Sequence, residues 1–253
     1  MSNPIAPSIS QAGRYEPFDL QLGRGQIFAH QLVNIQGYNA LQHDTFRAVW
    51  ENSNTADYVF PATAVPMAFT SSLAETCTIR VIGTGADYVS KTALVTFSNS
   101  TTGVVTSGTS TFFRINSMQA ISGTTLDTIV ATNGGVTYSQ ISPGTGQAQA
   151  SIYTVPLGYT FYLWRAQAFS TNNGTQYCTY RVWSQTFVGT NGAGSYTPSV
   201  VLNAPFTGGY SSTRIIPRGY PEKTDIQWQL KQSNPAPGSI QVEGILIKND
   251  GTL

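Results

Sequence analysis

From about residue 46 onward, apolar and polar residues alternate in short runs bounded by turn residues. The runs 77–81 (CTIRV) and 113–116 (FRIN) show the pattern clearly, and Asn133-Gly134 suits the tight turn of a hairpin. Period-two alternation between turns is typical of half-buried strands. Many short strands of this kind predict an all-β fold of the sandwich or jelly-roll type.

The second half of the chain has longer and more aromatic strand patterns. Residues 159–169 (YTFYLWRAQAF) are almost continuously apolar, and residues 226–230 place Ile226, Trp228 and Leu230 opposite Gln227 and Gln229. The segment 141–146 (ISPGTG) is typical of a boundary. We therefore expect tandem sandwiches at 46–140 and 141–253, the second jelly-roll-like. Residues 40–51 fit three helical turns, although their end fits a strand equally well.

Residues 1–45 have neither period for long and are punctuated by Pro4, Pro7 and Pro17. A frayed terminus is one interpretation. The other is an extended arm that orders against a neighbouring subunit, and the apolar content favours it. The arm's expected contact residues are Ile5, Phe18, Leu22, Ile27 and Phe28.

Composition separates this chain from most soluble domains. Only 10% of its 253 residues are charged and the formal net charge is +1, against roughly 25% charged residues in a typical domain. A surface of hydroxyls, amides and glycines is cheap to desolvate, which suits lasting contact with other protein. The balance of charge gives no reason to expect nucleic acid or an anionic membrane as a partner. The start has no signal-peptide pattern and no apolar run could span a membrane, so we expect a cytoplasmic product.

Groups for catalysis, metal or cofactor binding are sparse. The two cysteines, Cys77 and Cys178, are far apart in the sequence and are expected to be small buried side chains. His30 and His43 both lie in the irregular N-terminal segment. The candidate pairs of acids are Glu222 with Asp225, within a polar turn, and Asp44 with Glu51. We therefore predict no catalytic site, no metal site and no cofactor.

Exposed aromatic rings could bind a sugar, although large aromatics more often fill sandwich cores. Trp164 and Trp228 lie in apolar patterns and are expected in the core. Trp183 shares a strand side with Tyr177 and Arg181. Possible ligand-facing aromatics are therefore Tyr177, Tyr180 and Trp183.

Two parts of the second half carry a resemblance. Residues 152–163 (IYTVPLGYTFYL) predict a strand, a Pro-x-Gly turn and a strand, and residues 221–226 (PEKTDI) and 243–247 (EGILI) follow. Together these resemble a group of virion structural proteins of tailed bacteriophages, of the marine and cyanophage type. In that group the first motif is commonly YTVPAGKT, and here Leu157 and Tyr159 stand at the Ala and Lys positions. The resemblance extends more weakly toward residue 25 and implies no active-site residue.

The resemblance and the composition together predict a non-enzymatic virion protein that is assembled in a bacterial cytoplasm. The leading hypothesis is a decoration (cement) protein that stabilises a phage head through oligomeric sandwiches and the N-terminal arm. The expected partners are the major capsid protein or neck and tail proteins, and a homo-oligomer, with a trimer favoured over a dimer. The alternative is a neck, tail or fibre component that binds host glycans. A carbohydrate-active enzyme on a jelly roll is the third hypothesis, and the scarcity of acids counts against it.

Overall fold

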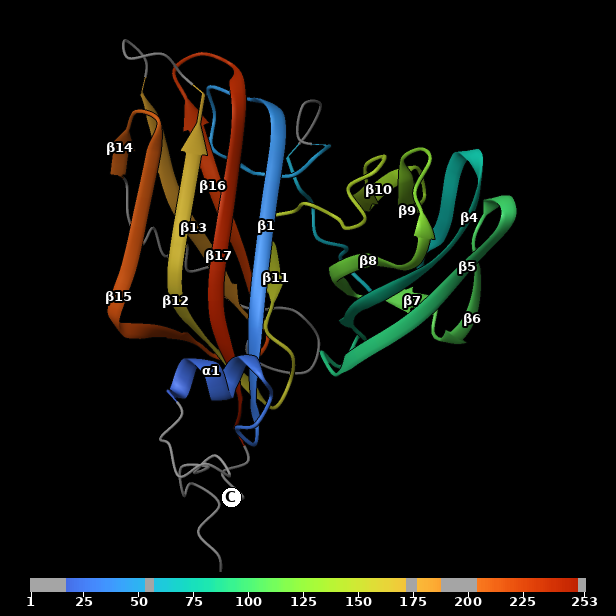
Figure 1. Ribbon diagram of the computed structural model, residues 1–253, viewed down its shortest axis with the longest axis horizontal. Coiled ribbons are helices and arrows are strands. Elements are labelled where there is room, and N and C mark those ends of the chain that lie inside the picture. Colours follow the sequence, from blue (N-terminus) through green and yellow to red (C-terminus); the bar gives the residue numbers. More distant parts are fainter. Residues whose placement is uncertain (1–16, 53–56, 172–176, 188–203, 250–253) are drawn as a thin grey trace, which may run out of the picture.

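The protein, seen here as a computed structural model, is built almost entirely of antiparallel strands (Figure 1). The structure describes residues 17–52, 57–171, 177–187 and 204–249. Within these ranges one short helix is present, α1 (Phe18–Gly23). The all-β fold predicted from the alternation is confirmed. No helix among the described residues is long and apolar enough to cross a membrane.

One domain consists of two sheets packed face to face. The first sheet has the order β1-β17-β12-β15, which are His30–Gln42, Ala236–Lys248, Tyr159–Ser170 and Gly209–Tyr220. The second has β16 (Thr224–Gln232), β13 (Cys178–Thr186) and β14 (Ala204–Phe206) in that order. Two short strands, β2 (Arg47–Ala48) and β11 (Ile152–Thr154), pair with the other edge of β16.

The strand order of this domain is that of a jelly roll, with one strand interrupted. Trp50 bridges Ala150, and the Ser151 N–H donates to the Val49 carbonyl oxygen at 2.9 Å, so β2 and β11 are two pieces of one edge strand. Counted as one, they leave eight strands in the orders 1-8-3-6 and 2-7-4-5, since the numbering skips β3 to β10. This is the double-sheet arrangement of a jelly roll. The chain leaves the jelly roll after β2 and returns at β11.

The excursion between β2 and β11 forms a second, inserted domain. Its six-stranded sheet contains β4 (Ala68–Thr84), β5 (Ser90–Thr102), β6 (Val104–Gly108), β8 (Arg114–Thr124), β9 (Ile129–Asn133) and β10 (Val136–Ile141). The long strand β4 pairs with β9 near its start and with β8 near its end, and its pairings with β5 and β8 both shift register. The sheet curls around its own core (Figure 1). A two-stranded sheet, β3 (Val65–Pro66) with β7 (Thr111–Phe112), lies beside it.

This topology differs from the tandem arrangement expected from the sequence. The sandwich expected at residues 46–140 is instead a curled sheet inserted into the jelly roll, and the jelly roll draws its first strands from before residue 50. Residues 30–42 were assigned to an extended arm, but they form β1, which pairs with β17 along its length. Ile35 of β1 is buried in the jelly-roll core. Residues 40–51 are strand and turn and contain no helix.

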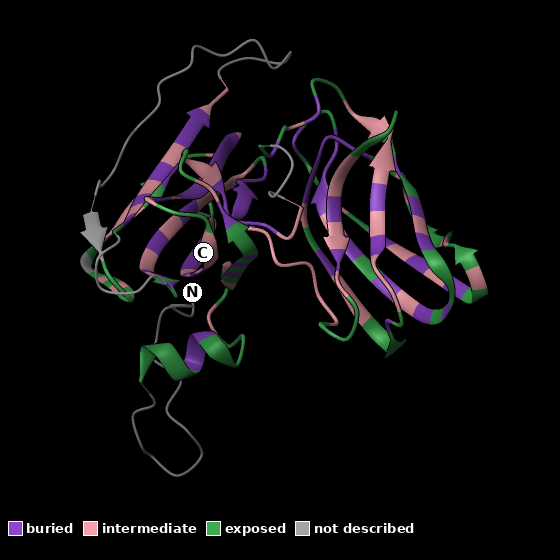
Figure 2. Ribbon diagram, turned by 90° about the horizontal axis from the view of Figure 1, so that it is seen from above, coloured by how far each residue is buried: buried purple, intermediate pink, exposed green. Residues whose placement is uncertain are grey.

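Each domain has its own apolar core, and alternate residues of the strands enter it (Figure 2). Phe161 and Trp228 meet edge to face in the jelly-roll core, with ring centroids 6.2 Å apart. Cys178 is buried in the jelly-roll core and Cys77 in the inserted-domain core, and both are free thiols. Trp164, expected in the core, is only partly buried, because β12 shifts register between Leu163 and Arg165.

Candidate functional site

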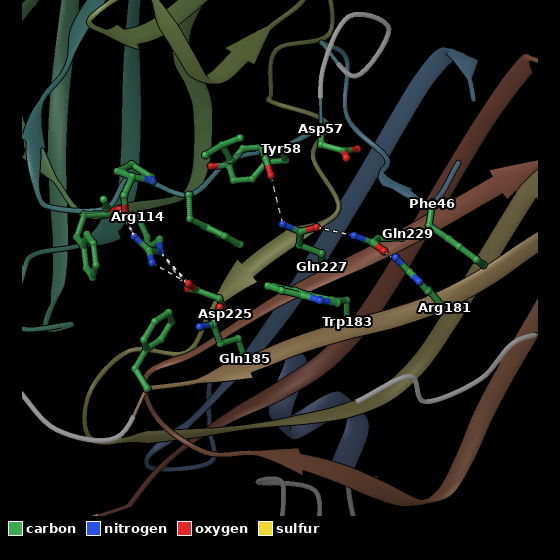
Figure 3. Close-up of a pocket in the computed structure, with 16 residues that line it drawn as sticks. Phe46, Asp57, Tyr58, Arg114, Arg181, Trp183, Gln185, Asp225, Gln227 and Gln229 are labelled. Carbon is green, nitrogen blue, oxygen red and sulfur yellow. Dashed lines mark hydrogen bonds and ion pairs between the residues drawn. The ribbon is translucent and has the colours of Figure 1, made fainter. Parts of the chain in front are cut away.

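A groove lies between the outer face of the second jelly-roll sheet and the segment that leads into the inserted domain (Figure 3). Its volume is about 620 Å³, which is within the range of small-molecule sites. Strands β13 and β16 form one wall. Residues 57–62 together with Phe113 and Arg114 form the other.

Three neighbouring cross-strand pairs form the sheet side of the groove. In the antiparallel pairing of β13 with β16, the partners are Arg181 with Gln229, Trp183 with Gln227, and Gln185 with Asp225. Because alternate residues of a strand share a face, all six side chains lie on the groove side. The opposite face carries Val182, Ile226, Trp228 and Leu230 into the core.

A chain of hydrogen bonds runs along the part of the groove that is lined by Arg181, Gln229 and Gln227. The Arg181 Nε donates to Gln229 Oε1 at 2.6 Å, and Gln229 Nε2 donates to Gln227 Oε1 at 2.7 Å. The Arg181 guanidinium also lies 4.0 Å from the centre of the Phe46 ring. Burial lowers the pKa of Arg181 from its usual value, and the Asp57 carboxylate opposes that shift. These contacts fix both amides in place.

Gln185 differs from the other two glutamines of the groove. Its side chain is 7% exposed, yet it forms no hydrogen bond with any of the residues that the structure describes. It lies beside Trp183 and Asp225 and lines the groove (Figure 3). Gln185 is therefore a hydrogen-bonding group that is available to a molecule in the groove.

A buried ion pair between Arg114 and Asp225 closes the end of the groove that lies opposite Arg181 (Figure 3). Arg114 Nη2 lies 2.8 Å from Asp225 Oδ2, and Arg114 Nε lies 3.0 Å from both carboxylate oxygens. Thr154 Oγ1 donates to Asp225 Oδ1 at 2.5 Å, and Arg114 Nη1 donates to the Pro61 carbonyl oxygen at 2.6 Å. Burial raises the pKa of the Asp225 carboxyl, and the Arg114 guanidinium opposes that shift.

Backbone packing sets the position of Arg114. The start of β8 approaches β4 so closely that a Cβ placed on Gly83 would lie 2.0 Å from the Arg114 carbonyl oxygen. Only glycine permits this approach. Phe113 continues the contact, since its N–H donates to the Thr84 carbonyl oxygen at 2.7 Å. The Phe113 ring lies beneath the Arg114 guanidinium, 3.8 Å away.

The acids near the groove have structural partners. Asp225 is fully occupied by Arg114 and Thr154, and Asp57 is exposed and lies 3.4 Å from Arg47. Glu222, the other acid of the sequence pair, accepts the Gly158 N–H at 2.7 Å and so holds the Pro-x-Gly turn. A retaining or inverting glycosidase needs two available carboxyl groups across the bond that it cleaves. The described part of the groove offers hydrogen-bonding amides and aromatic surface instead. No three potential metal ligands of the His, Cys, Asp or Glu type gather within the described ranges.

The three aromatic residues proposed from the sequence lie in three different environments. Trp183 lines the groove. Tyr177 is 53% exposed and lies outside it, where its backbone N–H donates to Ser233 Oγ. Tyr180 was predicted to face a ligand, and this is wrong, because it lies on the core side of β13 and stacks on Tyr210. The alternation around Trp228 already placed Gln227 and Gln229 away from the core, but nothing in the sequence joined them to Trp183 and Gln185.

The residues proposed for the arm differ in how far they are exposed. Ile5 lies outside the described residues. Phe18 and Phe28 are 45% and 63% exposed, and Ile27 is partly buried. Leu22 is buried within the chain's own fold, on α1, so the described structure does not present it to a partner.

Comparison with known proteins gives little that bears on this site. No protein-family model and no curated protein matches the chain. Two solved structures with weak similarity are T=1 particles derived from infectious bursal virus and the Gt strain of infectious bursal disease virus. Both are 11% identical to this chain. The first has a TM-score of 0.26 and the match covers 87% of this chain and 70% of that one, and the second has 0.27, 93% and 79%. Similarity at this level does not establish a shared fold.

Proposed function

We propose that this chain is a non-enzymatic structural protein of a virus particle, and more specifically a decoration (cement) protein of a phage head. The jelly-roll topology is one that viral shell proteins use, among other classes. The sequence resemblance in residues 152–163 and 221–226 favours the same class. These two segments also meet in the structure, because the Glu222 carboxylate caps the turn at Gly158. Fold alone does not fix function, so the proposal depends on the surface.

The surface feature that carries the proposal is a set of exposed apolar side chains on α1, in the loop that follows it and at the start of β1. They are Phe18 (45% exposed), Leu20 (50%), Phe28 (63%) and Leu32 (44%). Phe18 contacts the His30 ring edge to face, at 6.4 Å between centroids. Exposed apolar residues close together in the sequence, on a chain with few charges, are the side chains that we expect to contact another protein. We call residues 18–32 the apolar end of the jelly roll.

The proposed role is to hold neighbouring subunits together. Strand β1 stands at the end of its sheet order among the described strands, so a partner could extend the sheet by strand addition. The apolar end would contact the major capsid protein, and residues 1–16 would continue from it as the arm. A closed homo-oligomer, a trimer rather than a dimer, would multiply weak contacts into stable attachment. The particle would be assembled in the bacterial cytoplasm.

The test is binding to empty heads of the virus that encodes the chain. We expect the double variant Phe18→Ser/Phe28→Ser to lose co-sedimentation while keeping the melting temperature of the parent protein. The matched control is Val136→Ser, which changes an exposed apolar residue of the inserted domain and should bind normally. Unchanged occupancy of the double variant would contradict a role for the apolar end.

The alternative is a neck, tail or fibre component that binds host glycans, and the groove around Trp183 favours it. Copy number separates the two functions. A decoration protein should be present in many copies per particle and a neck or tail protein in few. Quantitative mass spectrometry of purified particles measures this directly.

A further inference from the structure

We propose that the groove between the two domains binds a neutral saccharide, with Trp183 as the stacking surface and Gln185 as the principal hydrogen-bonding group. This proposal deepens the glycan-binding alternative, yet it concerns the isolated chain and holds whichever part of a particle carries it. It moves the binding surface away from Tyr177 and Tyr180, which do not line the groove.

The groove has the size and lining that a short oligosaccharide needs. Its volume is about 620 Å³, and both aromatic and amide side chains line it. A pyranose ring has one face of C–H groups and a rim of hydroxyls, so it needs both kinds of surface. Trp183 from the sheet and Val59 from the opposite wall supply apolar surface, and three glutamines supply the polar groups.

The polar groups of the groove match hydroxyls rather than ions. A glutamine amide both donates and accepts hydrogen bonds, as a sugar hydroxyl does. Gln185 has its full side-chain capacity available within the described structure. Gln227 and Gln229 each use one oxygen and one nitrogen in the chain that starts at Arg181 and ends at the Tyr58 carbonyl oxygen, and each amide keeps one further N–H.

Charge in the groove is balanced before any ligand arrives. Arg114 is paired with Asp225, and the Arg181 guanidinium is held by Gln229 and the Phe46 ring. An anionic ligand would find no uncommitted cation among the described lining residues, and a cationic ligand would find only the exposed Asp57. The balance favours an uncharged ligand.

The groove is also pre-organised, which reduces the entropy lost on binding. Gln227 and Gln229 are each 7% exposed and are locked by neighbouring side chains. Trp183 is carried by a central strand of its sheet, between β16 and β14. Sites on strands hold their geometry better than sites on loops.

The test is saturation-transfer NMR on the full-length chain with neutral disaccharides: maltose, cellobiose, lactose and N,N′-diacetylchitobiose. 3′-Sialyllactose is the anionic comparison. We expect at least one neutral sugar to bind. Gln185→Ala should weaken that binding about tenfold, the effect of losing one or two amide hydrogen bonds, and Trp183→Ala should abolish it. Tyr177→Ala is the matched control and should bind as the parent does.

Three results would overturn the proposal: no binding by any neutral sugar, binding that survives both groove variants, or tighter binding of the anionic sugar. A melting curve of Gln185→Ala separates lost binding from lost folding, because its amide has no partner to lose. The same variant should co-sediment normally with empty heads. Failure of sugar binding and failure of particle binding are therefore distinguishable.

Discussion

Arg114 of the inserted domain and Asp225 of the jelly roll form a buried ion pair, with Nη2 and Oδ2 2.8 Å apart and side chains 3% and 0% exposed. Arg114 also donates to the Pro61 carbonyl oxygen, in the segment that connects the two domains. One guanidinium therefore contacts the inserted domain, the connecting segment and the jelly roll. Because the pair closes one end of the groove, it links the architecture of the chain to the proposed binding site.

Removing one partner of this pair should destabilise the protein strongly. Arg114→Ala leaves the Asp225 charge buried without its counter-ion, which typically costs about 3–5 kcal/mol. Urea unfolding measures the change. Arg80→Ala is the control, since Arg80 is exposed and its side chain bonds only to Gln119 among the residues that the structure describes. It should change the free energy of unfolding by less than about 0.5 kcal/mol. Equal effects of the two variants would show that the pair does not hold the domains.

The insertion predicts that the jelly roll can fold without the inserted domain. Trp50 and Ala150 are bridged partners, so a short Gly/Ser linker of about four residues can replace residues 51–149. The shortened chain should also carry Asp225→Asn, which removes the charge that Arg114 neutralises. We expect cooperative thermal unfolding and a strand-type circular dichroism spectrum. A chain that is unfolded at all temperatures would contradict the separation into two cores.

N-terminal truncation tests where the arm ends. Deletion of residues 1–16 removes nothing from the described fold and should leave the melting temperature unchanged. Deletion of residues 1–42 removes β1, which takes the Ile35 side chain out of the core and exposes the edge of β17. We expect that longer deletion to aggregate or to unfold. Similar stability of both truncated chains would contradict the assignment of β1 to the jelly roll.

Glu51 should make stability depend on pH. Burial raises the pKa of its carboxyl above the ordinary value of 4.5, so the native state binds this proton more tightly than the unfolded chain does. The stability from this group is present below pH 4.5 and is lost as the pH rises through the raised pKa. Glu51→Gln should therefore be more stable than the parent at pH 7 and equal to it below pH 4.5. Urea unfolding of both proteins at pH 7 and below pH 4.5 checks this. A parent protein that is more stable than Glu51→Gln at pH 7 would contradict it.

The sequence predicts the kind of fold better than its connections. Alternation in 77–81 and 226–230 identifies strands because each has one face in a core, and this requires only local information. The topology depends on which strands pair across long separations. β1 pairs with β17 more than 190 residues away, for instance His30 with Ile247, and its own pattern is irregular because it is an edge strand with an exposed apolar end. An edge strand of this kind resembles an arm when only the sequence is considered.

The groove could be predicted only in part for a similar reason. The sequence indicates that Trp183 faces away from the core, because it shares a strand side with polar residues. Tyr180 lies on the other side of the same strand and faces the core. Gln185 and Asp225 become neighbours only through the register of β13 with β16. Arg114 joins them only because the inserted domain folds back onto the sheet. No local pattern contains either relationship.

The measurement that tests the central claim most directly is a cryo-electron microscopy map of particles of the virus that encodes this chain, with a tag at Leu253 as the marker. The account predicts tagged jelly-roll density repeated on the outer surface of the head, with the apolar end at residues 18–32 against the major capsid protein. Particles that lack the chain would contradict a structural role in the virion, and tagged density confined to the neck or tail would contradict the decoration function.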